Sequence, residues 1–412
     1  MEINNRRLIL DLARHALACV AGDQVTEHAA HSCDFWQPLH VVAIGKAAAA
    51  MAAGVQRALP RQLRRTLVIT RPGHADNWQR ELPGAELIEA GHPLPTQGSL
   101  VAGERLLAWL AEADSDAHIL LLLSGGASSL VEVPLAGVDL ALLQRVNRWL
   151  LGSGLSIGQI NRVRCRLSRI KGGGLLQYLH GRTTSVWLLS DVAGDDPAVI
   201  GSGLCYPASS PAASAEYPDW LAETLAGLPP LPDVSALPVP EHRLLANLEQ
   251  ACTALADAAH DQGLKCTLHD LSLDGDAETT GRQLADELAR LPPGIHVWGG
   301  ETTVRLPPHP GRGGRNQQLA LAAAQVLARR DGISLLALGT DGSDGASEDA
   351  GALVDGGTIA RGELAGLDAA RQLRNADAGR FLEASGDLVS TGPTGTNVRD
   401  MMVACVRSQA SR

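Results

Sequence analysis

Two lysines lie beside glycines, where an ammonium group could serve a ligand. The chain has only three lysines among its 35 lysine and arginine residues. Lys46 follows the apolar run HVVAIG, and Lys171 lies in the segment RIKGGGL. Because arginine supplies positive charge elsewhere, we expect these lysines to be needed as compact point charges, and the glycines let a phosphate approach the backbone. The alternative is that both are chance survivors on exposed loops.

Carboxylates cluster after three further apolar runs, in the segments SDVAGDDP, GGETT and GTDGSDG. Such carboxylates repel one another unless a cation, a proton or an arginine compensates. They could hold Mg²⁺ through oxygen ligands, or one could act as a general base toward a hydroxyl group. In the first segment the alternative is a capping loop, since Asp-Asp-Pro also suits a helix start. The carboxylates are Asp191, Asp195, Asp196, Glu301, Asp341 and Asp344.

Glycine-rich turns offer backbone N–H groups to an anion. SGGASSL, from Ser124 to Leu130, follows the run ILLLL and is expected to open a helix. The N–H groups of Gly125 and Gly126 would then meet an anion at a helix N-terminus. STGPTGTNVRD, which contains Thr394 and Asn397, is a second such turn and is also expected to lead into a helix. Ordinary turns and caps are the alternative for both.

Arginines accompany glycines in two segments. GRGGRNQQ opens a long predicted helix and carries Arg312, Arg315 and Asn316. A guanidinium group matches carboxylate or phosphate in a bidentate way, and the adjacent glycines leave room for such a ligand. INRVRCRLSRIKGG concentrates basic residues and ends beside Lys171. For this second segment, a solvated helix face and phosphate contact remain equal alternatives.

The composition narrows the class of protein. With 412 residues, 45% of them hydrophobic and 19% charged, the chain is globular and long enough for two domains or three. A net charge of −10 argues against a nucleic-acid partner. The seven cysteines are scattered without a CxxC pair, which fits a reducing cytosol. The N-terminal segment is typical of an amphipathic helix, not a signal peptide, and no apolar stretch approaches the roughly 20 residues that span a bilayer. We therefore expect a soluble, cytoplasmic protein.

Short apolar runs alternate with helical segments along the chain. This alternation predicts buried parallel strands in βα units, with the Gly, Ser, Asp and His clusters gathered at one edge of the sheet, where open α/β folds bind ligands. Proline, alanine and serine dominate residues 206–240, which predicts a domain junction. The expected domains are residues 1–235 and 236–412. The chain is expected to close with a helix near NVRDMMVACV.

The motifs exclude several enzyme classes. No GxxxxGK[ST] is present, no GxGxxG follows the first strand, and GxSxG, HExxH and zinc spacings are missing. The sequence offers instead several phosphate-type cradles, a few basic anchors and acidic loops. This combination fits Mg-dependent phosphoryl transfer, in which catalysis is mostly positioning and charge neutralisation.

Taken in order, the motifs resemble the class II glycerate 2-kinase family, whose C-terminal part is called the MOFRL domain. The matching segments span residues 41–400 and include IGKAAAAM, EAGHPLP, LLSGGASSL, LSDVAGDDPAVIGSG, WGGETTV, GRGGRNQQLAL, ALGTDGSDG and TGPTGTNVRD. The resemblance implies an ATP-dependent kinase that phosphorylates the 2-hydroxyl of D-glycerate to give 2-phosphoglycerate. It also implies two α/β domains, the first Rossmann-like with a mainly parallel sheet and the second smaller, with the active site in the cleft between them.

Carried over by position, the resemblance implies three catalytic residues. Lys46 would neutralise charge on the transferred phosphoryl group, Asp191 would be the base, and Arg315 would grip substrate carboxylate or phosphate. Substrate and nucleotide, here ATP, would be bound by Gly45, Ser124, Gly125, Gly126, Lys171, Glu301, Arg312, Asn316, Asp341, Thr394 and Asn397. Asp195 and Asp344 are the candidate ligands of Mg²⁺.

The chain departs from the family pattern in three places. Ala127 replaces a glycine and Ser129 an alanine in the serine-glycine loop, Cys165 and Arg166 replace Lys and His, and SGLCYPASS replaces SGPTVPD. An alanine at position 127 could narrow the cradle if that residue needs positive φ. One hypothesis is an altered substrate, a longer or more oxidised hydroxy acid than glycerate. The alternative is drift at a tolerant edge of the site.

Two other functions stay open on the sequence. One is a catalytically weak paralogue that binds a hydroxy acid or a nucleotide, and the other is a hydroxypyruvate reductase, which the missing dinucleotide fingerprint disfavours. The expected partners are ATP and D-glycerate or a similar small hydroxy acid, with no nucleic acid and no membrane. The oligomeric state is open, with a homodimer as one option.

Overall fold

The computed structural model describes residues 5–207 and 216–407 and divides the chain into two compact units. The N-terminal unit comprises residues 22–245, and the C-terminal unit comprises residues 246–412 together with residues 1–21. The predicted division into residues 1–235 and 236–412 differs from these units in the position of the boundary and in the assignment of the first 21 residues. The boundary lies at the end of a strand rather than in the Pro-rich segment, and the first helix belongs to the C-terminal unit.

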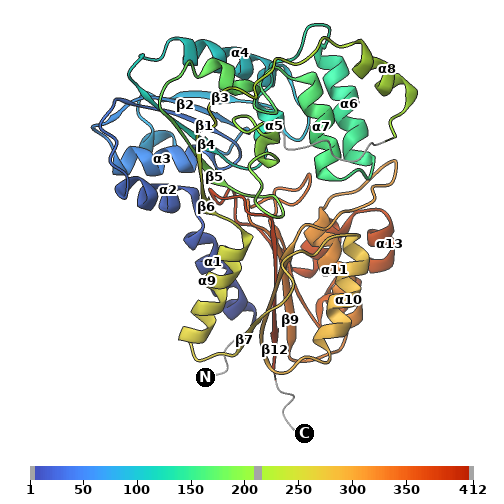
Figure 1. The fold of residues 1–412 in the computed structure, drawn as a ribbon. Helices are drawn as coiled ribbons and strands as arrows, with labels where there is room; N and C mark the ends of the chain where they lie inside the picture. The colour runs from blue at the N-terminus through green and yellow to red at the C-terminus, as the bar shows by residue number, and fades with distance from the viewer. Residues whose placement is uncertain (1–4, 208–215, 408–412) are drawn as a thin grey trace. The chain divides into compact units, whose positions relative to one another are not determined.

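The N-terminal unit is built on a six-stranded sheet with the strand order β3-β2-β1-β4-β5-β6 (Figure 1). The pairs β1–β2, β1–β4, β2–β3 and β4–β5 are all parallel. This order is that of a doubly wound, Rossmann-type sheet, as predicted. The strands are β1 (Leu39–Ile44), β2 (Leu63–Thr70), β3 (Glu86–Glu89), β4 (His118–Leu123), β5 (Thr184–Leu189) and β6 (Glu241–Ala246).

Helices follow most of these strands, as the alternation of apolar runs and helical segments predicts. All six residues of β1 are buried, which explains why its sequence LHVVAI is apolar without alternation. Trp109 of α4 anchors the core beside this sheet and is 1% exposed. The helices are α2 (Gly22–His31), α3 (Ala48–Ala58), α4 (Gln97–Ala111), α5 (Ala127–Leu130), α6 (Leu140–Gly152), α7 (Ile157–Leu167) and α8 (Asp219–Gly227), with 3-10 turns η1 (Gln79–Glu81), η2 (Gly174–Tyr178) and η3 (Ile200–Ser202).

The C-terminal unit holds a second six-stranded sheet, with the order β11-β10-β9-β12-β8-β7. This sheet is mixed, because β12 runs antiparallel to both of its neighbours, β8 and β9. The predicted closing helix is therefore wrong, since the segment DMMVACV forms the buried strand β12. A short apolar run has no periodicity that separates a buried strand from a helix. The strands are β7 (Cys266–Leu268), β8 (Gly294–Gly300), β9 (Ile333–Gly339), β10 (Gly351–Asp355), β11 (Leu388–Val389) and β12 (Asp400–Val406).

Helices lie on both faces of this second sheet. Figure 1 shows α1 and α9 on one face and α10 and α11 on the other. The predicted long helix after GRGGRNQQ is confirmed as α11, whose alanine-rich sequence is almost entirely buried. The helices are α1 (Asn5–Cys19), α9 (Leu248–Asp261), α10 (Ala277–Leu288), α11 (Arg315–Leu327), α12 (Thr358–Leu364), α13 (Ala369–Arg374) and α14 (Ala378–Ser385).

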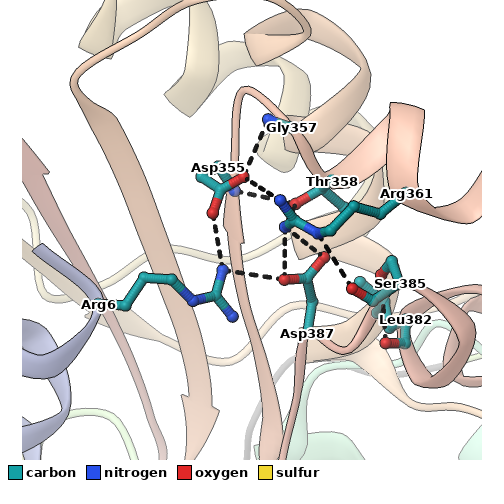
Figure 2. A network of polar contacts seen from close by, with 8 residues as sticks. All are labelled: Arg6, Asp355, Gly357, Thr358, Arg361, Leu382, Ser385 and Asp387. Atoms are coloured by element: carbon teal, nitrogen blue, oxygen red, sulfur yellow. Dashed lines mark hydrogen bonds and ion pairs between the residues drawn. The ribbon is translucent and has the colours of Figure 1, made fainter. Parts of the chain in front are cut away.

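An ion-pair network ties the first helix to the C-terminal unit (Figure 2). Arg6 of α1 contacts Asp355 and Asp387, each at 2.9 Å. Arg361 binds the same two carboxylates, at 3.0 and 2.7 Å. The Asp387 side chain is only 1% exposed, so two arginines compensate a carboxylate that would be costly to bury alone. This network explains why helix α1 belongs to a sheet that follows it by more than 200 residues.

Among the described residues, no helix is long and apolar enough to cross a membrane.

Candidate active site

The first group of predicted site residues lies at the carboxyl ends of β1 and β4, the two central strands of the N-terminal sheet. Gly45 and Lys46 follow β1, and Ser124, Gly125 and Gly126 follow β4. The chain runs from β1 outward to β2 and β3 on one side and from β4 outward to β5 and β6 on the other. Ligands of open α/β sheets bind at such a switch point, outside the carboxyl ends of the strands. The structure thus brings these five residues together where a ligand is expected.

Close backbone contact explains the glycine at position 45. Gly45 has φ +135°, and a Cβ atom there would lie 2.1 Å from the Ser124 hydroxyl oxygen. That hydroxyl accepts a hydrogen bond of 3.1 Å from the Ala47 N–H. The Lys46 N–H donates to the Gly125 carbonyl oxygen at 2.9 Å. Main-chain groups and one serine therefore hold the two loops together.

The lysine side chain lies against the glycine loop. Gly126 has φ +88°, and a Cβ atom there would stand 3.1 Å from the His92 ring and 3.4 Å from Cγ of Lys46. A side chain at Gly126 would therefore press on the His92 ring and pack in ordinary contact with the lysine stem. Helix α5 is a single turn of four residues, so the expected helix N-terminus contributes little dipole, and the cradle rests on loop N–H groups. Ala127 begins this turn and is not among the residues with positive φ, so its extra methyl group is tolerated.

The acidic loop of the next strand lies at the same edge. Asp191 follows β5, which pairs with β4, and its side chain is half-buried. Asp195 has a left-handed backbone, with φ +55°. Asp196 accepts a hydrogen bond of 2.9 Å from the Ala198 N–H. The capping alternative therefore holds for Asp196, whereas Asp191 is placed beside the loops of Lys46 and Ser124.

Lys171 serves the interior instead of a ligand. Its ammonium forms an ion pair with Glu132, and both side chains are 2% exposed. Burial of an ammonium requires such a partner, and the pair leaves little surface for a phosphate. The pair favours a structural role for Lys171, and its predicted role in ligand binding stays a prediction. No sequence pattern indicated this ion pair, because Glu132 is 39 residues away from Lys171.

The unusual Arg166 also has a structural partner. Its guanidinium donates to the carbonyl oxygens of Pro229 at 2.6 Å and of Leu228 at 2.7 Å, just beyond the end of α8. A cation at the C-terminus of a helix is favourable because the last carbonyls are unpaired there. Its neighbour Cys165 is buried, which raises the pKa of that thiol to about 11. Residues 208–210 of the third departure lie outside the described residues.

The second group of predicted residues gathers at one edge of the C-terminal sheet. Glu301 follows β8 and Asp341 lies just beyond β9, and Asp400 begins β12 between these strands. Asp400 is in register with Gly300 on one side and Gly339 on the other. The antiparallel central strand thus starts where its two neighbours end. Three acidic residues thus occupy strand ends at this edge, of which sequence reasoning missed Asp400.

Arg315 binds two of these carboxylates. Its Nε and Nη2 atoms both contact Asp400, the second at 2.9 Å, and Nη1 lies 3.0 Å from Glu301. The Asp400 side chain is 1% exposed, so this bidentate pair is largely desolvated. Nearby Asp400 and Glu301 raise the pKa of Arg315 against the opposing effect of burial. In this structure the arginine charge is balanced by two carboxylates, and the predicted grip on substrate stays a prediction.

Asp344 caps helix α11 from a distant loop. Its two carboxylate oxygens accept from the N–H groups of Asn316 at 3.0 Å and Gln317 at 2.8 Å. Gly314 precedes the helix, and a Cβ atom there would lie 2.3 Å from Cγ of Asp344. Burial raises the pKa of Asp344 to about 7. Asp344 therefore acts as a helix cap, for which Gly314 makes room, and its predicted metal role stays a prediction.

The remaining predicted residues are held by protein contacts. Arg312 pairs with Asp349 at 2.7 Å and Glu383 at 3.0 Å. Asn316 is fully buried, so it lies beneath the surface of this edge. The Asp341 carboxylate accepts from the Ser343 N–H at 2.9 Å.

The threonine-glycine turn leads into strand β12 and not into a helix. Within it, Thr394 donates to the Thr340 carbonyl at 2.5 Å, and Asn397 is 6% exposed. Arg312, Asn316 and Thr394 thus stabilise the loops at this edge.

No preformed metal site is apparent in the described part of the chain, where no group of three or more His, Cys, Asp or Glu side chains gathers. Mg²⁺ in phosphoryl-transfer sites is commonly held by one or two carboxylates and the substrate phosphates. The acidic loop after β5 supplies oxygen donors of this kind, so the residues present fit a metal that arrives with a nucleotide.

Comparison with known proteins identifies the family. Residues 8–218 match the family described as a domain of unknown function, DUF4147, and residues 294–400 match the MOFRL family. A D-glycerate 2-kinase of Thermotoga maritima is 33% identical over 97% of this chain and 98% of its own length. A glycerate 2-kinase of Pyrococcus horikoshii is 32% identical over 91% of this chain and 88% of its own length.

A solved structure of glycerate kinase from Thermotoga maritima superposes on the chain with a TM-score of 0.81. That comparison covers 97% of this chain and 99% of the other, at 32% identity. The resemblance found in the motifs is thereby confirmed over nearly the whole length. This chain belongs to the glycerate 2-kinase family with a C-terminal MOFRL domain.

Proposed function

We propose that this protein is a glycerate 2-kinase, which transfers the terminal phosphoryl group of ATP to the 2-hydroxyl of D-glycerate and forms 2-phosphoglycerate. One structural observation supports the proposal most directly. Lys46 and a glycine loop occupy the switch point between β1 and β4, where phosphate-bearing ligands bind in this architecture. The family membership supplies the reaction, and the site supplies groups that suit it.

The loop geometry supports a phosphate at Gly125 and Gly126. Because Gly126 has no side chain, the Lys46 stem lies against the loop. This position would place the lysine ammonium and the loop N–H groups on the same side of the sheet edge. Phosphoryl transfer needs little covalent chemistry from the protein, and positioned positive charge stabilises the transferred group. Lys46 is proposed to supply this charge.

Asp191 is proposed as the base that receives the proton of the 2-hydroxyl. It follows β5 directly, so a buried strand fixes the position of its backbone beside the loops of β1 and β4. A base within hydrogen-bond reach of the acceptor hydroxyl typically contributes a factor of roughly 10²–10⁴ to the rate.

The other assignments complete the proposal. Glu301 and Asp341 are proposed to orient substrate, nucleotide or metal, and Arg315 is proposed to position Glu301 through their ion pair. Asp195 would hold Mg²⁺ together with the phosphates of the nucleotide, and the metal would shield the phosphate charge. The location of the active site in a cleft between two domains stays a prediction, as does a homodimer.

The structure supports glycerate itself over an altered hydroxy acid. Arg166 is engaged with carbonyls near the end of α8, and Ala127 is accommodated in an ordinary helical turn. Two of the three departures that motivated an altered substrate therefore have structural explanations, and drift is favoured as their origin. A kinase assay over C3 and C4 hydroxy acids tests this, with a marked preference for D-glycerate as the expected result.

The decisive experiment combines three reactions on one preparation. The protein is incubated with ATP, Mg²⁺ and D-glycerate, and ³¹P NMR distinguishes 2-phosphoglycerate from 3-phosphoglycerate. NADH oxidation with hydroxypyruvate is measured in parallel, and ATP binding is measured without acceptor. We expect 2-phosphoglycerate and no NADH oxidation. Reduction of hydroxypyruvate, or nucleotide binding without any turnover, would replace the proposal with one of its two alternatives.

A further inference from the structure

We propose that the N-terminal unit carries a second ligand site, which binds a free α-amino acid with an apolar side chain. The site is a cavity of about 450 Å³, within the range of roughly 300–1,000 Å³ typical of small-molecule sites. Its lining comes from residues 33–37, which precede β1, and from the strands β4, β5 and β6. Nothing in the proposed kinase reaction uses these residues.

The cavity lies at the opposite edge of the sheet from the candidate active site. His118 is the first residue of β4, Thr183 immediately precedes β5, and Glu241 is the first residue of β6. The kinase residues follow the carboxyl ends of β1, β4 and β5. A strand of six residues separates its two ends by about 20 Å. A ligand in this cavity is therefore distinct from the proposed substrates.

The walls of the cavity are aromatic in a protein that has few aromatic residues. Phe, Trp and Tyr make up only 3% of the chain, yet Phe35, Trp36 and Trp187 all line this cavity. The Phe35 ring lies 6.1 Å from the Trp187 ring, which is almost fully buried. Trp36 is 95% exposed, an unusual position for a large apolar side chain. An apolar group inside the cavity would cover part of this aromatic surface.

Charges of both signs line the same cavity without neutralising one another. Within residues 5–207 and 216–407, no ion pair involves Asp34, Glu241 or Arg243. The Arg243 guanidinium lies 5.9 Å from the centre of the Trp187 ring and makes only long contacts, of 3.5 Å to Ser32 and 3.6 Å to Cys33. Arginine binds a carboxylate in a bidentate way when one is offered.

This charge pattern selects a zwitterion. A simple anion would approach two carboxylates, and a simple cation would approach the arginine at the aromatic wall. The ammonium of an α-amino acid suits Asp34 and Glu241, its carboxylate suits Arg243, and an apolar side chain suits the aromatic rings. His118 adds no charge to the balance, because burial lowers its pKa and its ring shares a hydrogen bond of 2.9 Å with Ser185.

Isothermal titration calorimetry on the full chain, without ATP or glycerate, tests the proposal. The probes are L-phenylalanine and L-leucine, with phenethylamine, which lacks the carboxylate, and 3-phenylpropionate, which lacks the ammonium. We expect one amino acid per chain and at least tenfold weaker binding of either analogue of phenylalanine. Arg243→Gln and Glu241→Gln should each weaken amino-acid binding at least tenfold.

Arg145→Gln is the matched control. Arg145 lies 4.0 Å above the ring of Trp220 in the same unit, so this variant also removes an arginine from an indole but leaves the cavity intact. It should bind the amino acid as the parent chain does. Absence of binding by both amino acids, equal binding of an analogue, or equal binding by Arg243→Gln would overturn the proposal. So would a loss of dimer on Trp36→Ala in sedimentation velocity, since a second copy would then cover the cavity.

Circular dichroism and kinase activity are recorded for every variant. Because the cavity residues are outside the proposed kinase site, a failed titration with normal phosphorylation would reject the second site alone. A protein that binds the amino acid but transfers no phosphate would reject the proposed kinase function alone.

Discussion

The two sheet edges that carry the predicted site residues are organised by different physical means. At the N-terminal edge, backbone hydrogen bonds and close glycine contacts hold the loops of Lys46 and Ser124 together. At the C-terminal edge, charged side chains hold the loops together, because Arg315 binds two carboxylates and Asp344 caps a helix. In sequence both edges are glycine-rich loops with charged residues after a strand.

This difference separates residues that can serve a ligand from residues that hold the fold. At the first edge the backbone and one serine make the contacts between the loops, whereas at the second edge the charge of Arg315 pairs with two carboxylates. Substitutions at the first edge should therefore change catalysis and leave stability nearly intact. Substitutions at the second edge, and at the buried pair of Lys171, should change stability first.

Lys46→Ala should give the largest effect on the reaction. We expect kcat for phosphorylation of D-glycerate to fall by roughly 10³-fold with an unchanged melting temperature, because positioned charge at the transferred phosphoryl group is lost. Lys46→Arg is the sharper variant, since a wide planar guanidinium should not replace a compact ammonium beside Gly126. Near-normal turnover in either variant would contradict the role of Lys46.

Asp191→Asn should lower kcat by roughly 10²-fold or more, because the amide cannot accept the hydroxyl proton. Asp196→Asn on the same loop is the matched control, and it should retain most activity because Asp196 caps a turn. Steady-state kinetics across pH would show whether the loss lies in kcat. If both variants lose activity equally, the loop as a whole matters and the base assignment fails.

Lys171→Met should destabilise the protein by about 3 kcal/mol or more, because it leaves the Glu132 carboxylate buried without a partner. The double variant Lys171→Met with Glu132→Leu removes both charges and should recover most of the loss. Urea unfolding measures each free energy. A stable single variant with a raised KM for ATP would instead restore the ligand role that the structure argues against.

Arg315→Gln should cost about 3 kcal/mol in the free energy of unfolding, because Asp400 is 1% exposed and would lose its bidentate partner. Arg312→Gln is a graded control, since the Arg312 side chain is 46% exposed and exposed pairs contribute about 1 kcal/mol or less. Equal losses in the two variants would show that burial does not distinguish the two arginines.

Asp344→Asn should cost about 2 kcal/mol, because one N–H group of α11 loses its acceptor. The pH dependence adds a second test. The pKa of Asp344 is raised to about 7 in the folded state, above its value of about 4 in an unfolded chain, so the folded state binds the proton more tightly. This contribution to stability is present below pH 4 and is lost as the pH rises to about 7. The variant should lack that part of the pH profile, and an unchanged profile would reject the assignment.

The sequence predicted well the first sheet and the positions of the loops that carry Lys46, Ser124 and Asp191. Buried parallel strands have continuous apolar runs, and their loops are rich in glycine and acid, so both the strands and the edge at Lys46 were accessible to pattern reasoning. The strand β12 was not, because DMMVACV fits a buried strand or a helix equally. Asp400 was missed with it, although an acid at the start of an apolar run was a usable signal.

The sequence by itself determined the family, the Rossmann-type order of elements in the first sheet and the candidates Lys46 and Asp191, since these follow from local patterns and motif order. Only the tertiary structure decided which charged side chains are paired with other side chains or backbone groups of the protein. Lys171, Arg315 and Asp344 look like ligand-binding residues along the chain, but each meets a partner 28 to 85 residues away. Burial and charge pairing are properties of contacts between distant segments, so no local pattern could assign these roles.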